Sequence, residues 1–283
     1  MPIAILERLF AGRWIAGPEI DDAIAVAKRF NRRGASAIFN YLGEDLKDRG
    51  AVDDAVKIYS QLINRIGKGG VRASISVKPT QLGASIGFKT FMKNYIKIVA
   101  LAKRNGVFVW FDMESQGMVD TVIKAYRGDM KSRDTGICIQ AYLTRSYADA
   151  LSLAKEGAVI RLVKGAYKES PDVAYQTKEA ITANYLRIME MLFRTSKRFM
   201  LATHDLGILE RAHKLNKAHK RQVEYAMLNG IRNKCVVAMA KHGDRVSVYV
   251  PFGGSWLNYS YRRLKEAGHL SLILKSVFED QAI

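Results

Sequence analysis

The stretch "GFKTFMKNYIKIVALAKRNGVFVWFDME", residues 87–114, places a helical pattern directly before a short apolar run. In its first part the apolar side chains recur at three- and four-residue steps with lysines between them, which is the period of an amphipathic helix. The apolar run that follows ends in Asp-Met-Glu, and such runs are typical of strands buried on both faces of a parallel sheet. The segment therefore predicts one helix–strand repeat of an α/β protein.

The same alternation continues through the rest of the chain. Each apolar run is followed by a segment of helical period, and no stretch rich in Pro, Gly or Ser divides the sequence. Eight strands, each followed by a helix, is the repeat of a (β/α)8 barrel. We therefore predict a TIM-type α/β barrel over residues 35–283, after an N-terminal helical segment over residues 1–34. The expected strands are 35–44, 71–80, 106–114, 135–143, 158–167, 198–205, 221–230 and 244–253.

The composition excludes several classes of protein. With 48% hydrophobic residues among 283, the chain can bury a large core and is not disordered. Its apolar runs fall short of the ~20 residues that span a bilayer, so we expect a cytoplasmic protein. The formal net charge of +18 suits nucleic acid, an anionic membrane surface or an anionic small molecule. Lys89, Lys93 and Lys97 recur every four residues, which is typical of a solvated helix face.

Polar side chains stand at the carboxyl ends of most predicted strands. In a (β/α)8 barrel this mouth carries the active site, while apolar side chains fill the interior. The cluster is rich in cations and lacks both metal-ligand spacing and a Gly-rich dinucleotide loop, so we expect no metal. Its members are Lys78, Asp112, Glu114, Gln140, Arg161, Lys164, Thr203, His204, Asp205 and Tyr249.

Lys78 and Lys164 each permit two interpretations. An amine buried at a barrel mouth can act as a neutral nucleophile and form a Schiff base, as in an aldolase or lyase. It can equally remain charged and hold a carboxylate or phosphate. In either case Asp112 can neutralise Lys78 or an arginine.

The stretch "YVPFGGSWLNYSYRRLKE", residues 249–266, ends the last predicted strand and begins a helix. Arg262 and Arg263 lie on that helix, and adjacent residues of a helix diverge by about 100°. Two arginines can therefore hold one carboxylate from different sides through their planar forks. The alternative is a salt bridge from Arg262 to Glu266 with both arginines exposed.

Five segments occur in an order that closely resembles the flavin-dependent proline dehydrogenases: "SVKPTQLG" (76–83), "FDME" (111–114), "RLVKGAY" (161–167), "ATHD" (202–205) and "YVPFGGSW…YRRLKE". The resemblance covers the chain from about residue 35, and the length is similar to the small monofunctional form. It implies a distorted barrel that holds FAD. It also implies oxidation of L-proline to Δ1-pyrroline-5-carboxylate by hydride transfer from proline C5 to FAD N5, with electrons passed to a quinone.

The resemblance further implies roles for individual residues. The proline carboxylate would lie among three cations, beside a carboxylate, and the ring against two apolar surfaces. These substrate residues are Lys78, Arg262, Arg263, Asp112, Tyr249 and Leu228. Asp112 and Arg161 are the expected catalytic residues, Arg161 as the hydrogen-bond donor to flavin N5. The other expected FAD contacts are Met113, Gln140, Lys164, Gly165, Ala166, Thr203 and His204. Asn229 stands where many relatives carry a tyrosine.

Two other functions and one location remain open at this point. A Schiff-base aldolase would use Lys164 or Lys78, and a basic binding module would take nucleic acid. We expect no nucleic-acid partner, because no aromatic side chains alternate with the lysines as they do in base-stacking surfaces. The basic charge and a lipid-soluble electron acceptor also suggest peripheral attachment to the inner face of the cell membrane.

Overall fold

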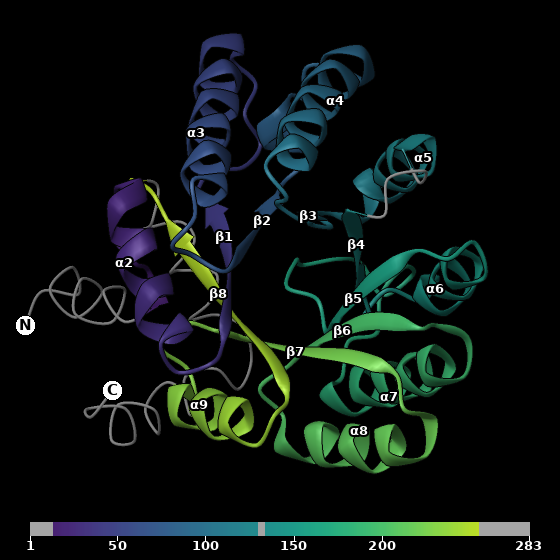
Figure 1. The fold of residues 1–283 in the computed structure, drawn as a ribbon. Helices are drawn as coiled ribbons and strands as arrows, with labels where there is room; N and C mark the ends of the chain where they lie inside the picture. The colour runs from purple at the N-terminus through teal and green to yellow at the C-terminus, as the bar shows by residue number, and fades with distance from the viewer. Residues whose placement is uncertain (1–13, 130–133, 255–283) are drawn as a thin grey trace, which may run out of the picture. The chain divides into compact units, whose positions relative to one another are not determined.

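The computed structural model describes residues 14–129 and 134–254 (Figure 1). Within these residues, eight strands follow one another in the order of a closed barrel, β1 to β8, which confirms the predicted fold class. The strands are β1 (Ser36–Tyr41), β2 (Ala73–Val77), β3 (Val109–Phe111), β4 (Thr135–Gln140), β5 (Val159–Val163), β6 (Arg198–Ala202), β7 (Gln222–Leu228) and β8 (Arg245–Phe252).

Helices follow the strands as the apolar periodicity predicts. The described helices are α2 (Ile20–Asn31), α3 (Arg49–Gly67), α4 (Phe88–Arg104), α5 (Val119–Asp129), α6 (Ser146–Lys155), α7 (Lys178–Thr195), α8 (Leu206–His219) and α9 (Asn233–Lys241), with short 3-10 helices η1 (Thr80–Leu82) and η2 (Gln116–Met118). The helix expected after β8 lies outside the described residues. None of the described helices is both long and apolar enough to cross a membrane.

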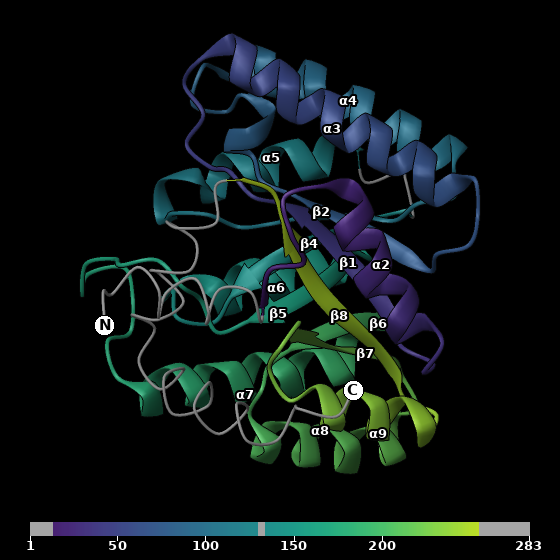
Figure 2. The ribbon, with the colours of Figure 1, turned by 90° about the vertical axis from the view of Figure 1, so that its left-hand side faces the viewer.

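The chain divides into two compact units. The first contains the residues up to Phe108 and those from Met227 onward, and the second contains Val109–Ala226. In the first unit β1 pairs in parallel with both β2 and β8, with Ile38 opposite Tyr249. Helices α3 and α4 lie side by side in both views (Figures 1 and 2). Helix α2 packs on β8 and β1 through an apolar stripe that includes Ala27 and Phe30.

In the second unit, strands β3 to β7 form a continuous parallel set. Their register places Cys138 on β4 opposite Arg161 on β5, and Arg161 opposite Met200 on β6. Strand β3 has only three residues, fewer than its apolar run predicts, and the chain leaves it at Asp112. Asp112, just past β3, and Gln140, the last residue of β4, therefore lie at neighbouring strand ends, whereas Arg161 is the third of the five residues of β5 and not at its end as expected.

Candidate active site

The centre of the second unit's site is a buried ion pair between Arg161 and Asp112. Arg161 is 2% exposed, and its guanidinium donates a short hydrogen bond to the Asp112 carboxylate. The guanidinium carbon also lies 5.1 Å from the centre of the Trp110 ring, which is a cation–π contact. Of the two pairings that the sequence left open for Asp112, the structure shows the one with an arginine. Carboxylate and aromatic ring together fix the direction of the Arg161 fork.

Gly136 makes room for the Trp110 ring. A side-chain carbon at Gly136 would lie 2.5 Å from that ring and 3.0 Å from the carbonyl oxygen of Val159, well inside contact distance. The position on β4 therefore requires glycine because of close packing with the ring that supports the Arg161 guanidinium.

We expect Gly136→Ala to lower the free energy of unfolding by about 1–3 kcal/mol, since the buried ring must move to accommodate the methyl group. Chemical denaturation measures the change. Gly128→Ala is the matched control: Gly128 lies in α5, where an alanine methyl group would have no other atom within 4 Å, so alanine there should stabilise the helix by up to about 1 kcal/mol. An unchanged unfolding curve for Gly136→Ala would contradict this account of the packing.

Gln140 and Met113 lie together at the ends of β4 and β3. The Gln140 side-chain nitrogen donates to the Met113 carbonyl oxygen at 3.1 Å, and both residues are buried. Among residues 14–129 and 134–254, no group donates to the Gln140 side-chain oxygen, although it is buried. A buried acceptor of this kind matches a ligand that carries an N–H group.

Lys164 lies just past β5 with its charge compensated. Its ammonium is 3.1 Å from an Asp205 carboxylate oxygen and 3.2 Å from the Thr182 hydroxyl. Burial acts to raise the pKa of Asp205, but Lys164 and the amide groups at the start of α8 together lower it. The Lys164 side chain is also 37% exposed, so it is not the desolvated amine that a Schiff-base lysine requires. This geometry favours a fixed positive charge over a Schiff-base role.

The remaining predicted cofactor residues of this unit lie at the ends of β5 and β6. Gly165 has a φ of 113°, and a side chain there would clash with the Tyr142 ring, so the turn requires glycine. Thr203 is buried and its hydroxyl accepts from the Asp205 amide at 3.1 Å. Ala166 and His204 are half-buried. The strand ends thus bring these residues to the same edge of the unit.

Lys78 lies in the first unit and is held through its backbone. Its amide donates to the side-chain oxygen of the fully buried Gln81 at 3.1 Å, and the Tyr59 hydroxyl donates to the same oxygen at 2.9 Å. The Gln81 amide group also donates to the carbonyl oxygen of Tyr41. The sequence did not single out Gln81, although it belongs to the "SVKPTQLG" motif.

Leu228 and Tyr249 lie in the same unit. Leu228 belongs to an apolar cluster with Trp14, Ile15, Leu42 and Ile231, and Tyr249 packs against it. The backbone of Asn229 donates to the Tyr249 carbonyl oxygen at 2.9 Å. Leu228 and Tyr249 therefore border the same apolar cluster. Trp14 is a member that no motif indicated. Arg262 and Arg263 lie outside the described residues.

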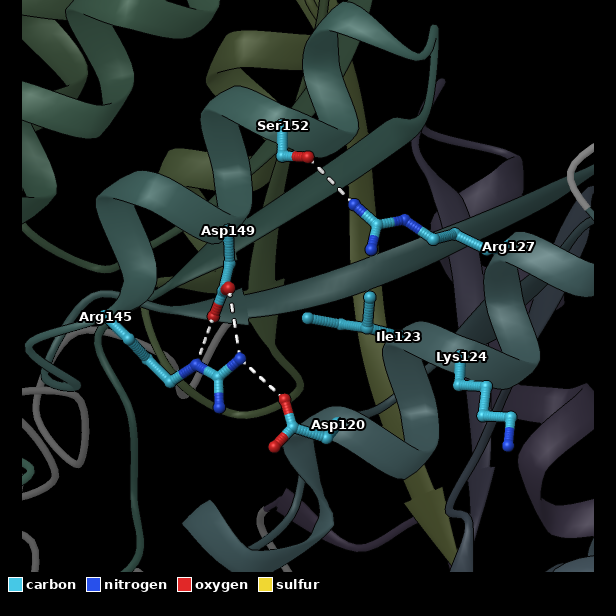
Figure 3. A pocket seen from close by; sticks show the side chains of 7 residues that line it. All are labelled: Asp120, Ile123, Lys124, Arg127, Arg145, Asp149 and Ser152. Atoms are coloured by element: carbon cyan, nitrogen blue, oxygen red, sulfur yellow. Dashed lines mark hydrogen bonds and ion pairs between the residues drawn. The ribbon is translucent and has the colours of Figure 1, made fainter.

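A cavity of about 410 Å³ lies elsewhere in the second unit, between α5 and α6 (Figure 3). Arg145 points from the edge of the cavity to Asp149 and Asp120, while Arg127 points to Ser152. These cations are already bound by groups of the protein, and none of the predicted site residues lines the cavity. It is therefore distinct from the strand-end site.

The sequence matches known proteins of one family. Residues 23–275 match the family model described as proline dehydrogenase. The chain is 31% identical to proline dehydrogenase 1 of Bacillus subtilis subsp. natto over 277 residues, which is 96% of this chain and 92% of that protein. It is 32% identical to the proline dehydrogenase of Deinococcus radiodurans over 265 residues, which is 90% of this chain and 86% of that protein.

The chain belongs to the proline dehydrogenase family.

Solved structures with this fold include larger proteins. Proline utilization A of Bdellovibrio bacteriovorus, inactivated by N-propargylglycine, matches with a TM-score of 0.84 at 23% identity over 97% of this chain. The protein of the same name from Corynebacterium freiburgense matches with a TM-score of 0.78 at 22% identity. This member of the proline dehydrogenase family spans about a third of the length of those chains, 34% and 33%. These likenesses support the barrel fold.

Proposed function

We propose that the protein oxidises L-proline to Δ1-pyrroline-5-carboxylate with FAD as cofactor and passes the electrons to a quinone. The family membership carries the reaction, and the buried pair of Arg161, within β5, and Asp112, just past β3, is the structural feature that best supports it. FAD would supply the acceptor for the hydride that leaves proline C5. The protein's contribution is position and electrostatic field.

The residues of the second unit fit FAD. Gln140 presents a buried acceptor for which the isoalloxazine imide N–H is a suitable donor. Lys164 provides positive charge suited to a pyrophosphate, and Thr203 and His204 add polar groups at the neighbouring strand end. Met113, Gly165 and Ala166 complete the proposed set of contacts. Lys164 would then exchange part of its contact with Asp205 for the cofactor.

Arg161 would act on the cofactor side of the reaction. A guanidinium held by Asp112 and Trp110 can donate a hydrogen bond without reorganising when negative charge arrives beside it. The low exposure of the pair strengthens this interaction, because little water screens it. Arg161 would thus stabilise the negative charge that develops on the cofactor when it accepts the hydride from proline.

On the substrate side, three cations would orient proline. Lys78, Arg262 and Arg263 would bind the carboxylate, while Leu228 and Tyr249 would pack against the ring. Positive charge around the carboxylate also disfavours the ammonium form of the substrate amine, and the neutral amine is the form that loses hydride.

The absorption spectrum of the purified protein tests the reaction. We expect a yellow protein with flavin bands that bleach when L-proline is added without oxygen. L-Alanine is the matched control, because it carries the same charges without the ring. A protein that stays colourless and inert after FAD is supplied would overturn the proposal.

Helix α4 offers a surface for contact with the membrane that holds a quinone. Its outward face carries Lys89, Lys93 and Lys97, all exposed, and the helix contains no acidic residue. Ile96 lies on the same face and is 57% exposed, while Phe88 at the start of the helix is 39% exposed. Basic side chains with exposed apolar neighbours suit an anionic lipid surface.

Replacing the three lysines of α4 by glutamine should weaken binding to phosphatidylglycerol vesicles about 100-fold at low salt, since each lysine contributes about 1 kcal/mol near such a surface. Vesicle sedimentation measures the binding, with phosphatidylcholine vesicles as the uncharged comparison. The matched control carries the same substitution at Lys214, Lys217 and Lys220, which lie at the end of α8. Equal losses in the two triple variants would rule out a specific role for α4.

A further inference from the structure

The segment Trp14–Gly17 lies across the end of β8 in the first unit. We call it the N-terminal strap. Two backbone hydrogen bonds of 2.9 Å hold it there, one from the Ala16 amide to the Pro251 carbonyl and one from the Gly253 amide to the Gly17 carbonyl. The strap is therefore attached to the last residues of β8, at the end where the active site of this fold forms.

The Trp14 side chain belongs to the apolar cluster at this end of the unit. It is 1% exposed, and the cluster also contains Leu228 at the end of β7 and Leu42 just past β1. Tyr249 of β8 packs against the same cluster. The Asn229 side chain also donates to the Trp14 carbonyl oxygen at 3.3 Å. Trp14 is thus held in a cluster that includes residues at the ends of β7 and β1, and Tyr249 within β8 packs against that cluster.

Leu228 and Tyr249 are the two residues proposed above to face the proline ring. The large Trp14 side chain fills space in the same cluster, and protein interiors are densely packed. Leu228 therefore has little room to shift away from a larger substrate. We propose that Trp14 is a positioning residue that limits the ring size of the substrate through Leu228 and Tyr249. The inference rests on the proposed oxidation of proline.

The chemical consequence is discrimination between cyclic amino acids. A five-membered ring fits against a wall that cannot move, whereas a six-membered ring such as that of pipecolate needs one more methylene of space. Removing Trp14 would open a cavity behind Leu228, into which the wall can shift. One methylene in an apolar pocket typically changes affinity about 10- to 200-fold, so the effect is measurable.

The test uses binding as well as turnover. Cyclopentanecarboxylate and cyclohexanecarboxylate present a carboxylate and a ring but cannot be oxidised at an amine. Calorimetry on the FAD-loaded protein gives the dissociation constant of each acid. We expect the wild type to favour the smaller ring and Trp14→Ala to reduce that preference at least about tenfold, with a parallel change in the KM ratio of pipecolate to proline.

Three further variants separate positioning from general damage. Trp14→Phe should retain most of the preference, and Trp14→Leu replaces the alanine variant if circular dichroism shows that the latter does not fold. Phe30→Leu is the matched control, because Phe30 is fully buried in the neighbouring α2 and is not a member of the apolar cluster. A folded Trp14→Ala or Trp14→Leu variant with the wild-type preference would overturn the inference. So would an equal change in Phe30→Leu. A wild-type protein that neither binds these acids nor bleaches with proline would overturn the proposed function as well.

Discussion

Replacing Arg161 by methionine is expected to slow the reduction of the bound flavin by proline about 100- to 1000-fold, the loss typical of removing one well-placed donor to a developing negative charge. Methionine keeps much of the side-chain volume but removes the guanidinium. The Asp112 carboxylate then loses its ion-pair partner in a buried site. Anaerobic stopped-flow absorption measures the rate directly, because it follows the flavin bands within a single turnover.

Arg187 provides the matched control for this substitution. Its guanidinium lies 3.9 Å from the centre of the Tyr147 ring, so it too is an arginine over an aromatic ring, but it lies on the helix α7 rather than on a strand. Arg187→Met should leave the rate of flavin reduction unchanged. Asp112→Asn, alone and combined with Arg161→Met, gives the coupling between the two residues, which should exceed about 1 kcal/mol for direct contact. A wild-type rate in Arg161→Met would contradict the assigned role.

Replacing Arg262 or Arg263 by alanine is expected to raise the KM for proline by about one to two orders of magnitude, because a hydrogen bond to a charged group is worth about 1.5–3 kcal/mol. The effect on kcat should be smaller, since these two arginines, which we call the carboxylate clamp, would bind a part of the substrate that does not react. Lys78→Met should also raise the KM. Steady-state kinetics over a wide proline range separates the two constants.

The control for the clamp must remove a positive charge elsewhere, because the protein carries a net charge of +18 that attracts anions from a distance. Lys217→Ala removes one exposed charge from α8. Its KM should stay close to that of the wild type at physiological salt, where distant charges are screened. An unchanged KM in both arginine variants would exclude the clamp.

The barrel could be predicted from the sequence because its signals are local. Each strand is a short apolar run and each helix has its own period, as in α4, where every buried position follows the spacing of one face. Strand ends were marked by changes from apolar to polar residues, which indicated Asp112 and Gln140. Arg161 was indicated in the same way, although it is the third of the five residues of β5. The alternation therefore determined both the fold class and the strand-end residues.

These local signals could not predict contacts between segments that are far apart in the sequence. Asp112 and Arg161 are 49 positions apart, and their pairing depends on the register between β4 and β5. Trp14 and Asn229 are separated by 215 positions, and nothing near Trp14 in the sequence indicates its contact with the strand ends. The role of Gln81 could not be predicted for another reason. Its hydrogen bonds with Lys78 and Tyr41 require the turn at η1, and the periodicity of apolar residues does not predict such a turn.

The two cysteines differ in burial, so their rates of chemical labelling can report when the strands of the barrel separate. Cys138 is buried on β4, opposite Arg161, whereas Cys235 on α9 is partly exposed. Burial raises the pKa of both thiols, which slows their alkylation in the folded state. Pulsed labelling should therefore modify Cys235 first. Modification of Cys138 would count only those molecules whose interior strands have separated, so mass spectrometry of the two peptides would time that separation without any added probe.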